Sequence, residues 1–290
     1  MTDKPSSELR GRVVMVTGAN AGMGKEISLG LARMGASLFM VCRDRKRGEL
    51  AHIAVQQHAG NPDVELMVAD LSSQKSIRQM VEEFNTGHER LHVLVNNAGM
   101  TSATRSETVD GLETVFATNH LGPFLLTNLL LPVLRASAPS RVVVVSSGVE
   151  AMGKLDFEDL QSKRSYGEIR AYNASKLANI LFTYELARRV KGGGVTANAV
   201  EPGFIKTNLK VPFPFSIFSF MRGKAADGAK PSIFLASSRD VEGVSGAFYS
   251  NKGIPIKSSK ITYDESVAER LWTVSAELTN LGSDSQGESA

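Results

Sequence analysis

The stretch VVMVTGANAGMGKEISLGLARM, from Val13 to Met34, decides the fold that we expect for this chain. It opens with a run that is apolar at every position, which is typical of a strand buried on both faces of a parallel sheet. A glycine-rich turn and a helical pattern follow. In such a unit the glycines let the backbone approach a phosphate, and the helix N-terminus supplies N–H donors and positive potential. The alternative is a purely structural turn, because any tight strand-to-helix connection favours glycine.

Six further strand-like runs alternate with helical patterns along the rest of the chain. They cover residues 36–42, 64–69, 91–95, 141–145, 195–200 and 246–249. Such alternation predicts right-handed β–α–β crossovers. The fold class that we predict is therefore α/β: a single-domain, Rossmann-type, doubly wound parallel sheet of about seven strands with helices on both faces. We place this dinucleotide-binding and catalytic domain at 11–280, between a flexible N-terminus (1–10) and a polar tail (281–290).

Composition excludes several classes of function. The net charge is only +3 and no concentrated basic stripe is present, so we expect no nucleic-acid binding. A single cysteine, Cys42, rules out an intramolecular disulfide, and five scattered histidines give no metal-ligand spacing. The first ten residues are polar, and no run approaches the ~20 apolar residues that a membrane helix needs. We predict a cytoplasmic protein without an integral membrane segment, and leave peripheral membrane contact open.

The charged run RDRKR (43–47) directly follows the second predicted strand. In a dinucleotide-binding fold the end of this strand meets the adenosine ribose, where an acidic residue binds the 2′-hydroxyl and an arginine accommodates a 2′-phosphate. Arg43 therefore favours NADP(H) over NAD(H), although Asp44 one place later weakens this preference. The alternative is a solvated charged run that opens a helix.

Polar and small residues stand at the ends of the next three predicted strands. Asp70 and Leu71 follow the third, Asn96-Asn97-Ala98-Gly99 end the fourth, and Ser146-Ser147 end the fifth. Open α/β sheets bind ligands at this edge, and small and amide residues would let a flat ring lie against it. The asparagines also suit ordinary turn chemistry. For the serines, helix capping is disfavoured because no helical pattern begins directly after them.

Asn119 and His120 interrupt an apolar stretch between two consecutive helical patterns within 108–134. A polar group in such surroundings must find partners. We expect Asn119 to hold a helix bend or a water molecule. We expect His120 to be structural, because no residue at ligand or triad spacing accompanies it.

Tyr172 and Lys176 stand at i and i+4 near the start of a helical pattern that runs to about residue 190. Their side chains therefore share one helix face. A free tyrosine has a pKa of ~10, and a nearby positive charge favours the phenolate and lowers that pKa. The pair is a candidate general acid/base. A surface tyrosine beside a solvated lysine is the alternative.

Taken together, these motifs resemble those of the short-chain dehydrogenase/reductase family over about residues 10–280. They are, in family order, Thr17-Gly18-x3-Gly22-x-Gly24, Asp70, Asn96-Asn97-Ala98-Gly99, Asn119, Ser147, Tyr172-x3-Lys176 and Pro202-Gly203. Residues 171–179 (AYNASKLAN) and 268–272 (AERLW) resemble the retinol-dehydrogenase-like branch. Members of that branch reduce or oxidise apolar carbonyls and alcohols, commonly with NADP(H), so the resemblance implies an oxidoreductase of class EC 1.1.1.-.

The resemblance also implies roles for single residues. Tyr172 exchanges a proton with the substrate oxygen, and Lys176 lowers the pKa of that tyrosine and binds the nicotinamide ribose. Ser147, in preference to Ser146, orients the substrate oxygen, and Asn119 holds a water that links Lys176 to a proton relay. The implied cofactor-binding residues are Gly18, Asn20, Gly22, Met23, Gly24, Arg43, Asp70, Leu71, Asn97, Ala98, Gly99, Tyr172, Lys176, Pro202, Gly203, Ile205 and Thr207.

Two features of the sequence differ from the pattern of the retinol-dehydrogenase-like branch, and one apolar segment has several possible uses. Glu201 stands where a neutral residue or histidine is usual before Pro-Gly, and no membrane anchor is seen at the start of the chain. Residues 211–221 (VPFPFSIFSFM) are rich in phenylalanine and favour a substrate lid over about 205–223, with a membrane contact or an oligomer contact as alternatives.

We therefore predict an NADP(H)-dependent enzyme that acts on a small apolar carbonyl or alcohol. The family often forms dimers, so a homodimer is left open. The alternatives are a non-catalytic dinucleotide-sensing protein, and an epimerase or dehydratase of the same fold that retains its cofactor.

Overall fold

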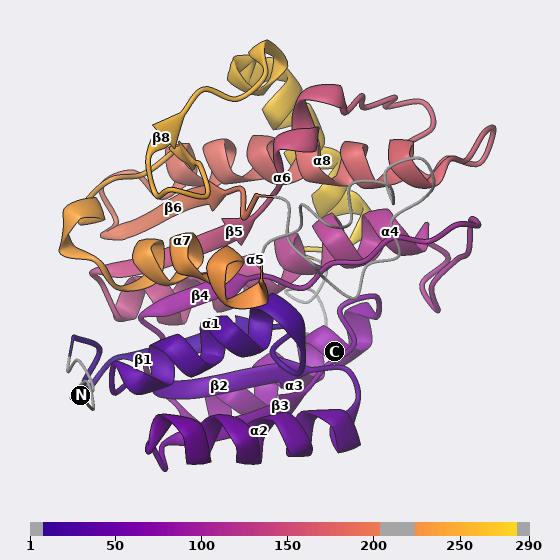
Figure 1. Ribbon diagram of the computed structural model, residues 1–290. Helices are drawn as coiled ribbons and strands as arrows, with labels where there is room; N and C mark the ends of the chain where they lie inside the picture. The colour runs from indigo at the N-terminus through magenta and orange to yellow at the C-terminus, as the bar shows by residue number, and fades with distance from the viewer. Residues whose placement is uncertain (1–7, 204–223, 283–290) are drawn as a thin grey trace, which may run out of the picture.

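The computed structural model describes residues 8–203 and 224–282, and its centre is an eight-stranded sheet (Figure 1). The strand order is β3-β2-β1-β4-β5-β6-β7-β8. The strands are β1 (Val13–Thr17), β2 (Ser37–Cys42), β3 (Val64–Val68), β4 (Val93–Asn96), β5 (Ser140–Val145), β6 (Val195–Val200), β7 (Phe248–Tyr249) and β8 (Pro255–Ile256). All neighbours from β3 to β7 are parallel. The predicted α/β fold is confirmed.

The eighth strand is the difference from the predicted sheet. β8 has two residues, both exposed, and it runs antiparallel to β7 with Ile256 opposite Phe248. Two exposed residues show no apolar run and no alternation, so the sequence pattern gives no strand signal there. Its proline fits an edge position, where a missing N–H is tolerated.

Helices cover both faces of the sheet. They are α1 (Gly22–Arg33), α2 (Arg45–Ala59), α3 (Gln74–Gly87), α4 (Thr114–Phe116), α5 (Gly122–Ala136), α6 (Glu168–Arg189), α7 (Ala225–Ser237) and α8 (Glu265–Leu278). Helices α1, α2 and α7 contribute to one hydrophobic cluster, and α3, α5 and α6 to a second cluster on the opposite face. Helix α8 packs against α6. This two-faced covering explains why the central strands are apolar at every position.

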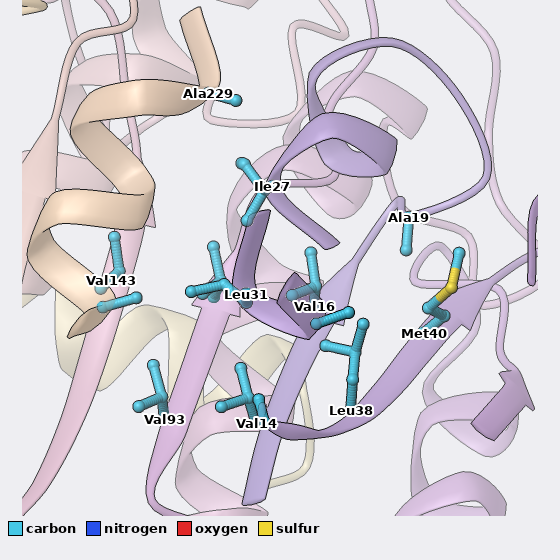
Figure 2. Close-up of a cluster of buried hydrophobic side chains, with 14 of the residues drawn as sticks. Val14, Val16, Ala19, Ile27, Leu31, Leu38, Met40, Val93, Val143 and Ala229 are labelled. Atoms are coloured by element: carbon cyan, nitrogen blue, oxygen red, sulfur yellow. The ribbon is translucent and has the colours of Figure 1, made fainter. Parts of the chain in front are cut away.

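Strand β1 illustrates the alternation between the two faces. Val14 and Val16 lie in the cluster with Ile27 and Leu31 of α1 (Figure 2). Met15, between them, lies in the cluster on the other face. All three of these β1 side chains are fully buried. Both faces of β1 are therefore core, as its apolar sequence predicts.

A π-helical turn, η1 (Ala117–Leu121), joins α4 to α5 and carries Asn119 and His120. His120 is fully buried, with Nε2 3.0 Å from Ser275 Oγ and Nδ1 3.4 Å from Asn179 Oδ1. Burial lowers the pKa of His120 to about 4, so the imidazole is neutral at physiological pH. His120 is thus a buried, hydrogen-bonded side chain, as expected for a structural histidine, and Asn119 lies in the π-helical turn.

The segment after β5 differs from the expectation that no helix begins there. A 3-10 helix, η2 (Gly148–Met152), starts at once, with Ser147 at its N-cap. The described residues also form the 3-10 turns η4 (Arg239–Val241) and η5 (Lys260–Tyr263). A single 3-10 turn has no amphipathic period long enough to be read from sequence.

The sheet order reverses between β1 and β4. From β1 the chain crosses through α1 to β2 on one face, and from β4 it crosses through α4 and α5 to β5 on the other. The carboxyl ends of the strands at such a switch point form the crevice where open α/β sheets bind ligands. The predicted lid (about 205–223) lies outside the described residues, and the predicted flexible N-terminus (1–10) and polar tail (281–290) lie mostly outside them.

Candidate active site

The glycine-rich turn after β1 allows its backbone to pack closely against neighbouring groups. Gly18 and Gly22 have φ of 66° and 53°, in the left-handed region that favours glycine. A Cβ on Gly24 would lie 2.2 Å from the Gly18 carbonyl oxygen, so the start of α1 packs directly on the turn. The N-cap residue Ala21 makes no side-chain hydrogen bond, and the first turn of α1 has no acidic residue. The first N–H groups of α1 are thus left for an anion.

Thr17 ties this turn to the end of β4. Its Oγ1 accepts from the backbone N–H groups of Asn97 (3.0 Å) and Ala98 (3.1 Å), and Asn97 Nδ2 donates to the Thr17 carbonyl at 2.8 Å. Asn97 therefore joins two strand ends and does not close a turn on its own backbone. No role was predicted for Thr17 beyond its place in the glycine-rich motif. A single hydroxyl at the end of an otherwise apolar strand was the available signal.

Tyr172 and Lys176 lie at the carboxyl end of β5, on the first turns of α6. Lys176 Nζ is 5.5 Å from the centre of the Tyr172 ring and donates to the Val145 carbonyl at 3.0 Å. Lys176 is only 3% exposed. The pair is therefore not a tyrosine beside a solvated lysine.

The pKa values of the pair differ from the expectation that Lys176 lowers the pKa of Tyr172. Burial raises the pKa of Tyr172 to about 12 and lowers the pKa of Lys176 to about 8. Desolvation opposes the charged form of both groups, and it is the cause of both shifts in this structure. At neutral pH the phenol keeps its proton and the ammonium keeps most of its charge.

Asn119 connects the π-helical turn to two other segments. Its Oδ1 accepts from Met100 N–H (2.8 Å), while Nδ2 donates to the Met100 carbonyl (2.9 Å) and to Ser175 Oγ (3.0 Å). Ser175 Oγ in turn donates to the Tyr172 carbonyl at 2.7 Å. Both amide hydrogens of Asn119 are used, so its side chain offers a water molecule only an acceptor.

The surroundings of Gly99 show that Asn119 and Lys176 lie close together. A Cβ on Gly99 would lie 3.5 Å from Asn119 Oδ1 and 3.6 Å from Lys176 Nζ. The end of β4, the π-helical turn and α6 thus meet at one point. Because residue 99 is glycine, no side chain fills the space next to Asn119 Oδ1 and Lys176 Nζ.

The two serines after β5 have different surroundings. Ser146 is buried, and its Oγ donates to the Lys176 carbonyl at 2.7 Å. Ser147 is half-buried, and its Oγ makes one long contact, 3.5 Å from Val149 N–H. Ser147 is therefore the serine whose hydroxyl is available to a ligand.

Arg43 is exposed at the end of β2 and forms no ion pair with the described part of the chain. Asp44 is the N-cap of α2, where its carboxylate accepts from Arg47 N–H at 2.9 Å. Asp44 thus caps α2. This structural role accounts for an acidic residue directly after Arg43.

Asp70 and Leu71 lie in the turn after β3. Asp70 Oδ1 accepts from the N–H (2.9 Å) and the hydroxyl (2.7 Å) of Ser72. Leu71 is buried, and a Cβ on Gly122 would lie 2.3 Å from its carbonyl oxygen. Both residues have structural contacts of their own, and their cofactor roles stay predictions.

Four of the remaining predicted cofactor residues lie in the described part of the chain, and two lie outside it. Asn20 and Met23 are half-buried in the turn after β1 and at the start of α1, and Pro202 and Gly203 are half-buried after β6. Gly203 has φ of 76°, and a Cβ there would lie 2.8 Å from Asn251 Nδ2. Ile205 and Thr207 lie outside the described residues.

Comparisons with known proteins agree with this geometry. A family model described as short chain dehydrogenase matches residues 12–214. Retinol dehydrogenase 14 of Mus musculus is 43% identical over 295 residues, which cover 94% of this chain and 87% of that protein. Retinol dehydrogenase 11 of Homo sapiens is 43% identical over 279 residues, with coverage of 94% and 87%.

Solved structures share the fold. A crystal structure of an uncharacterised protein from Mycobacterium paratuberculosis matches with a TM-score of 0.79 and 35% identity, over 96% of both chains. A short chain dehydrogenase from Shigella flexneri 2a, complexed with NADP, matches with a TM-score of 0.68 and 23% identity, over 85% of this chain and 99% of that one. Across residues 8–203 and 224–282, none of the helices has the length and apolar character needed to cross a membrane.

Proposed function

Because this chain belongs to the short-chain dehydrogenase family and is an oxidoreductase, we propose that it uses NADP(H) to interconvert an apolar aldehyde or ketone and the corresponding alcohol. The observation that carries this proposal is the meeting of Gly99, Asn119 and Lys176 at the end of β4, beside Tyr172 on the same helix face. Names of relatives support the substrate class, since retinol dehydrogenases act on an apolar alcohol.

The residues present fit a dinucleotide. The turn after β1 has positive-φ glycines, a contact between Gly24 and Gly18 that a Cβ would prevent, and an uncapped helix N-terminus without an acidic residue. Gly18, Asn20, Gly22, Met23 and Gly24 would hold the pyrophosphate there. When bound, the nicotinamide supplies or accepts the hydride.

The protein contributes the proton and its position. In reduction, Tyr172 gives its phenolic proton to the carbonyl oxygen, and in oxidation it takes the proton back. Ser147 donates a hydrogen bond to that oxygen and orients it. Lys176 stabilises the phenolate that remains after proton transfer, because opposite charges in a buried site attract strongly.

The preference for NADP(H) is proposed from the end of β2. Arg43 is exposed and unpaired within the described part of the chain, so its guanidinium is free for a 2′-phosphate. Asp44 caps α2, where its Oδ1 accepts from Arg47 N–H. Peripheral membrane contact, a homodimer and a cytoplasmic location stay predictions.

A panel of retinal, decanal, a 3-ketosteroid and a quinone with NADPH tests the proposal at the nicotinamide absorbance. We expect turnover of at least one apolar aldehyde or ketone, and faster turnover with NADPH than with NADH. Tyr172→Phe, run in parallel, is the control for activity from contaminating reductases. A wild-type protein that binds NADPH but consumes none with any of these compounds would contradict the assignment.

A further inference from the structure

A carboxylate without a cationic partner in the described part of the chain lies beside Ser147. Glu201 follows β6, and its backbone N–H donates to the Tyr249 carbonyl of β7 at 2.9 Å. Its side chain is half-buried, and burial raises its pKa. A carboxylate withdrawn from water needs a compensating donor. The group that the Glu201 carboxylate contacts therefore determines where this side chain lies.

That partner is Gly148. The Glu201 carboxylate lies against the backbone of Gly148, whose N–H favours the charged form and partly offsets the effect of burial on the pKa. Oε2 of Glu201 lies 2.5 Å from the place that a Cβ on residue 148 would occupy. A side chain at position 148 would therefore push the carboxylate away. Glycine at 148 therefore leaves room for the Glu201 carboxylate in this position.

This contact acts on the segment that carries Ser147. The Ser146 N–H donates to the Val200 carbonyl at 2.8 Å, so the chain after β5 is anchored to β6 just before Ser147. The Glu201–Gly148 contact anchors it again just after Ser147. Within the described residues, the Ser147 hydroxyl has only the 3.5 Å contact with Val149 N–H to hold it. Its orientation is thus set by the backbone on either side.

We propose that Glu201 is a positioning residue, which holds Gly148 and thereby directs the Ser147 hydroxyl toward the substrate oxygen. This inference rests on the proposed function, because it assigns Glu201 to the same reaction centre. It gives a physical role to a position at which the sequence departs from the usual branch pattern.

The contact itself is tested without activity, by nuclear magnetic resonance of protein labelled with [15N]glycine. The Gly148 N–H signal is the one that Gly148→Ala removes. We expect Glu201→Gln to move this signal, because a charged acceptor shifts an amide proton more than a neutral amide does. Glu269→Gln, an exposed glutamate of α8, is the matched control and should leave the signal in place. A Gly148 signal that is identical in wild type and Glu201→Gln would overturn the proposal.

The positioning role is tested by a double-mutant cycle with decanal and retinal as probes. We expect Glu201→Ala to lower kcat about tenfold, since misplacement of a reacting group costs up to about 10²-fold. NADPH affinity, measured by fluorescence, should change less than about twofold because Glu201 acts through Ser147 and not through the cofactor. In a Ser147→Ala background the same change should lower kcat less than about twofold, because residues that act as a unit are not additive.

Two kinetic results would overturn the role. A tenfold loss that persists in the Ser147→Ala background would show that Glu201 does not act through Ser147. A parallel loss of NADPH affinity would assign Glu201 to the cofactor. Absence of turnover in the wild-type protein would instead contradict the proposed function, and the glycine signal would still decide whether Glu201 holds Gly148.

Discussion

The ammonium of Lys176 lies 5.5 Å from the centre of the Tyr172 ring while it donates a hydrogen bond to the carbonyl oxygen of Val145, 3.0 Å away. The phenol and the ammonium are both removed from water, with pKa values of about 12 and about 8. At neutral pH the phenol therefore keeps its proton, and the neighbouring cation would favour the phenolate left by the proposed transfer to a substrate oxygen.

Replacing Tyr172 by Phe removes the transferable proton and leaves the packing of the ring almost unchanged. We expect kcat to fall about 10²- to 10⁴-fold, the usual contribution of general acid–base catalysis, with NADPH affinity within about twofold of wild type. Steady-state rates and NADPH fluorescence titration measure the two effects. Tyr263→Phe, at an exposed tyrosine on η5, is the control and should keep wild-type rates. Wild-type turnover by Tyr172→Phe would remove the acid/base assignment.

The pH dependence of reduction follows from the lowered pKa of Lys176. Lys176 loses its charge as the pH rises through about 8, whereas Tyr172 keeps its proton up to about 12. We therefore expect kcat/KM for reduction to be level below about pH 8 and to fall above it, because the phenolate is then left without its cation. Rates measured in buffers of constant ionic strength test this. A rate that rises through the same range would mean that neutral Lys176 is the active form.

Lys176 also makes the folded protein less stable than an apolar residue would. Its folded pKa lies below the ordinary value of about 10.4, so the unfolded state binds more protons between about pH 8 and 10.4, and stability rises with pH there. We expect Lys176→Met to be inactive but about 1–3 kcal/mol more stable below pH 8, with an advantage that shrinks toward pH 10.4. Urea unfolding at both ends of this range measures the difference.

The control for that comparison is Lys75→Met, an exposed lysine of α3. It should change stability by less than about 0.5 kcal/mol at either pH. Lower stability of Lys176→Met at neutral pH would show that the hydrogen bond to Val145 outweighs desolvation of the ammonium.

The sequence patterns predict most strands and helices of the molecule well, because the spacing of apolar residues reflects which faces of each element are buried. Val14, Met15 and Val16 are apolar because β1 has core on both faces, and that is visible in the sequence itself. The two exposed residues of β8 carry no such signal. The single turn η2 is equally invisible, because its N-cap Ser147 precedes too few residues to show a period.

The sequence predicts which residues form the candidate site, but it does not predict their energetics. The i, i+4 spacing places Tyr172 and Lys176 on one face, yet the direction of the Tyr172 pKa depends on burial by segments distant in the chain. In the same way, the hydroxyl of Ser146 is engaged by the carbonyl of Lys176, thirty residues later. Such partners are set by tertiary packing.

The two serines after β5 should respond differently to loss of their hydroxyls. Ser147→Ala should lower kcat by about 10²-fold with little change in stability, because its hydroxyl has one long contact and is available to the substrate oxygen. Ser146→Ala should instead lower stability by about 1 kcal/mol, because its buried 2.7 Å hydrogen bond to Lys176 is lost. Kinetics and urea unfolding of both variants make the comparison. The reverse pattern would exchange the roles of the two serines.

We expect cofactor preference to depend on the exposed guanidinium of Arg43 at the end of β2. Arg43→Asp should weaken NADPH binding at least about tenfold while changing NADH binding less than about threefold, because only NADPH carries the 2′-phosphate that Arg43 would contact. Lys46→Asp, in the first turn of α2, introduces the same change of charge nearby and controls for long-range electrostatics. Fluorescence titrations of both cofactors with wild type and both variants give the ratios. Equal losses for NADPH and NADH in Arg43→Asp, or an equal NADPH loss in Lys46→Asp, would contradict a specific role of Arg43.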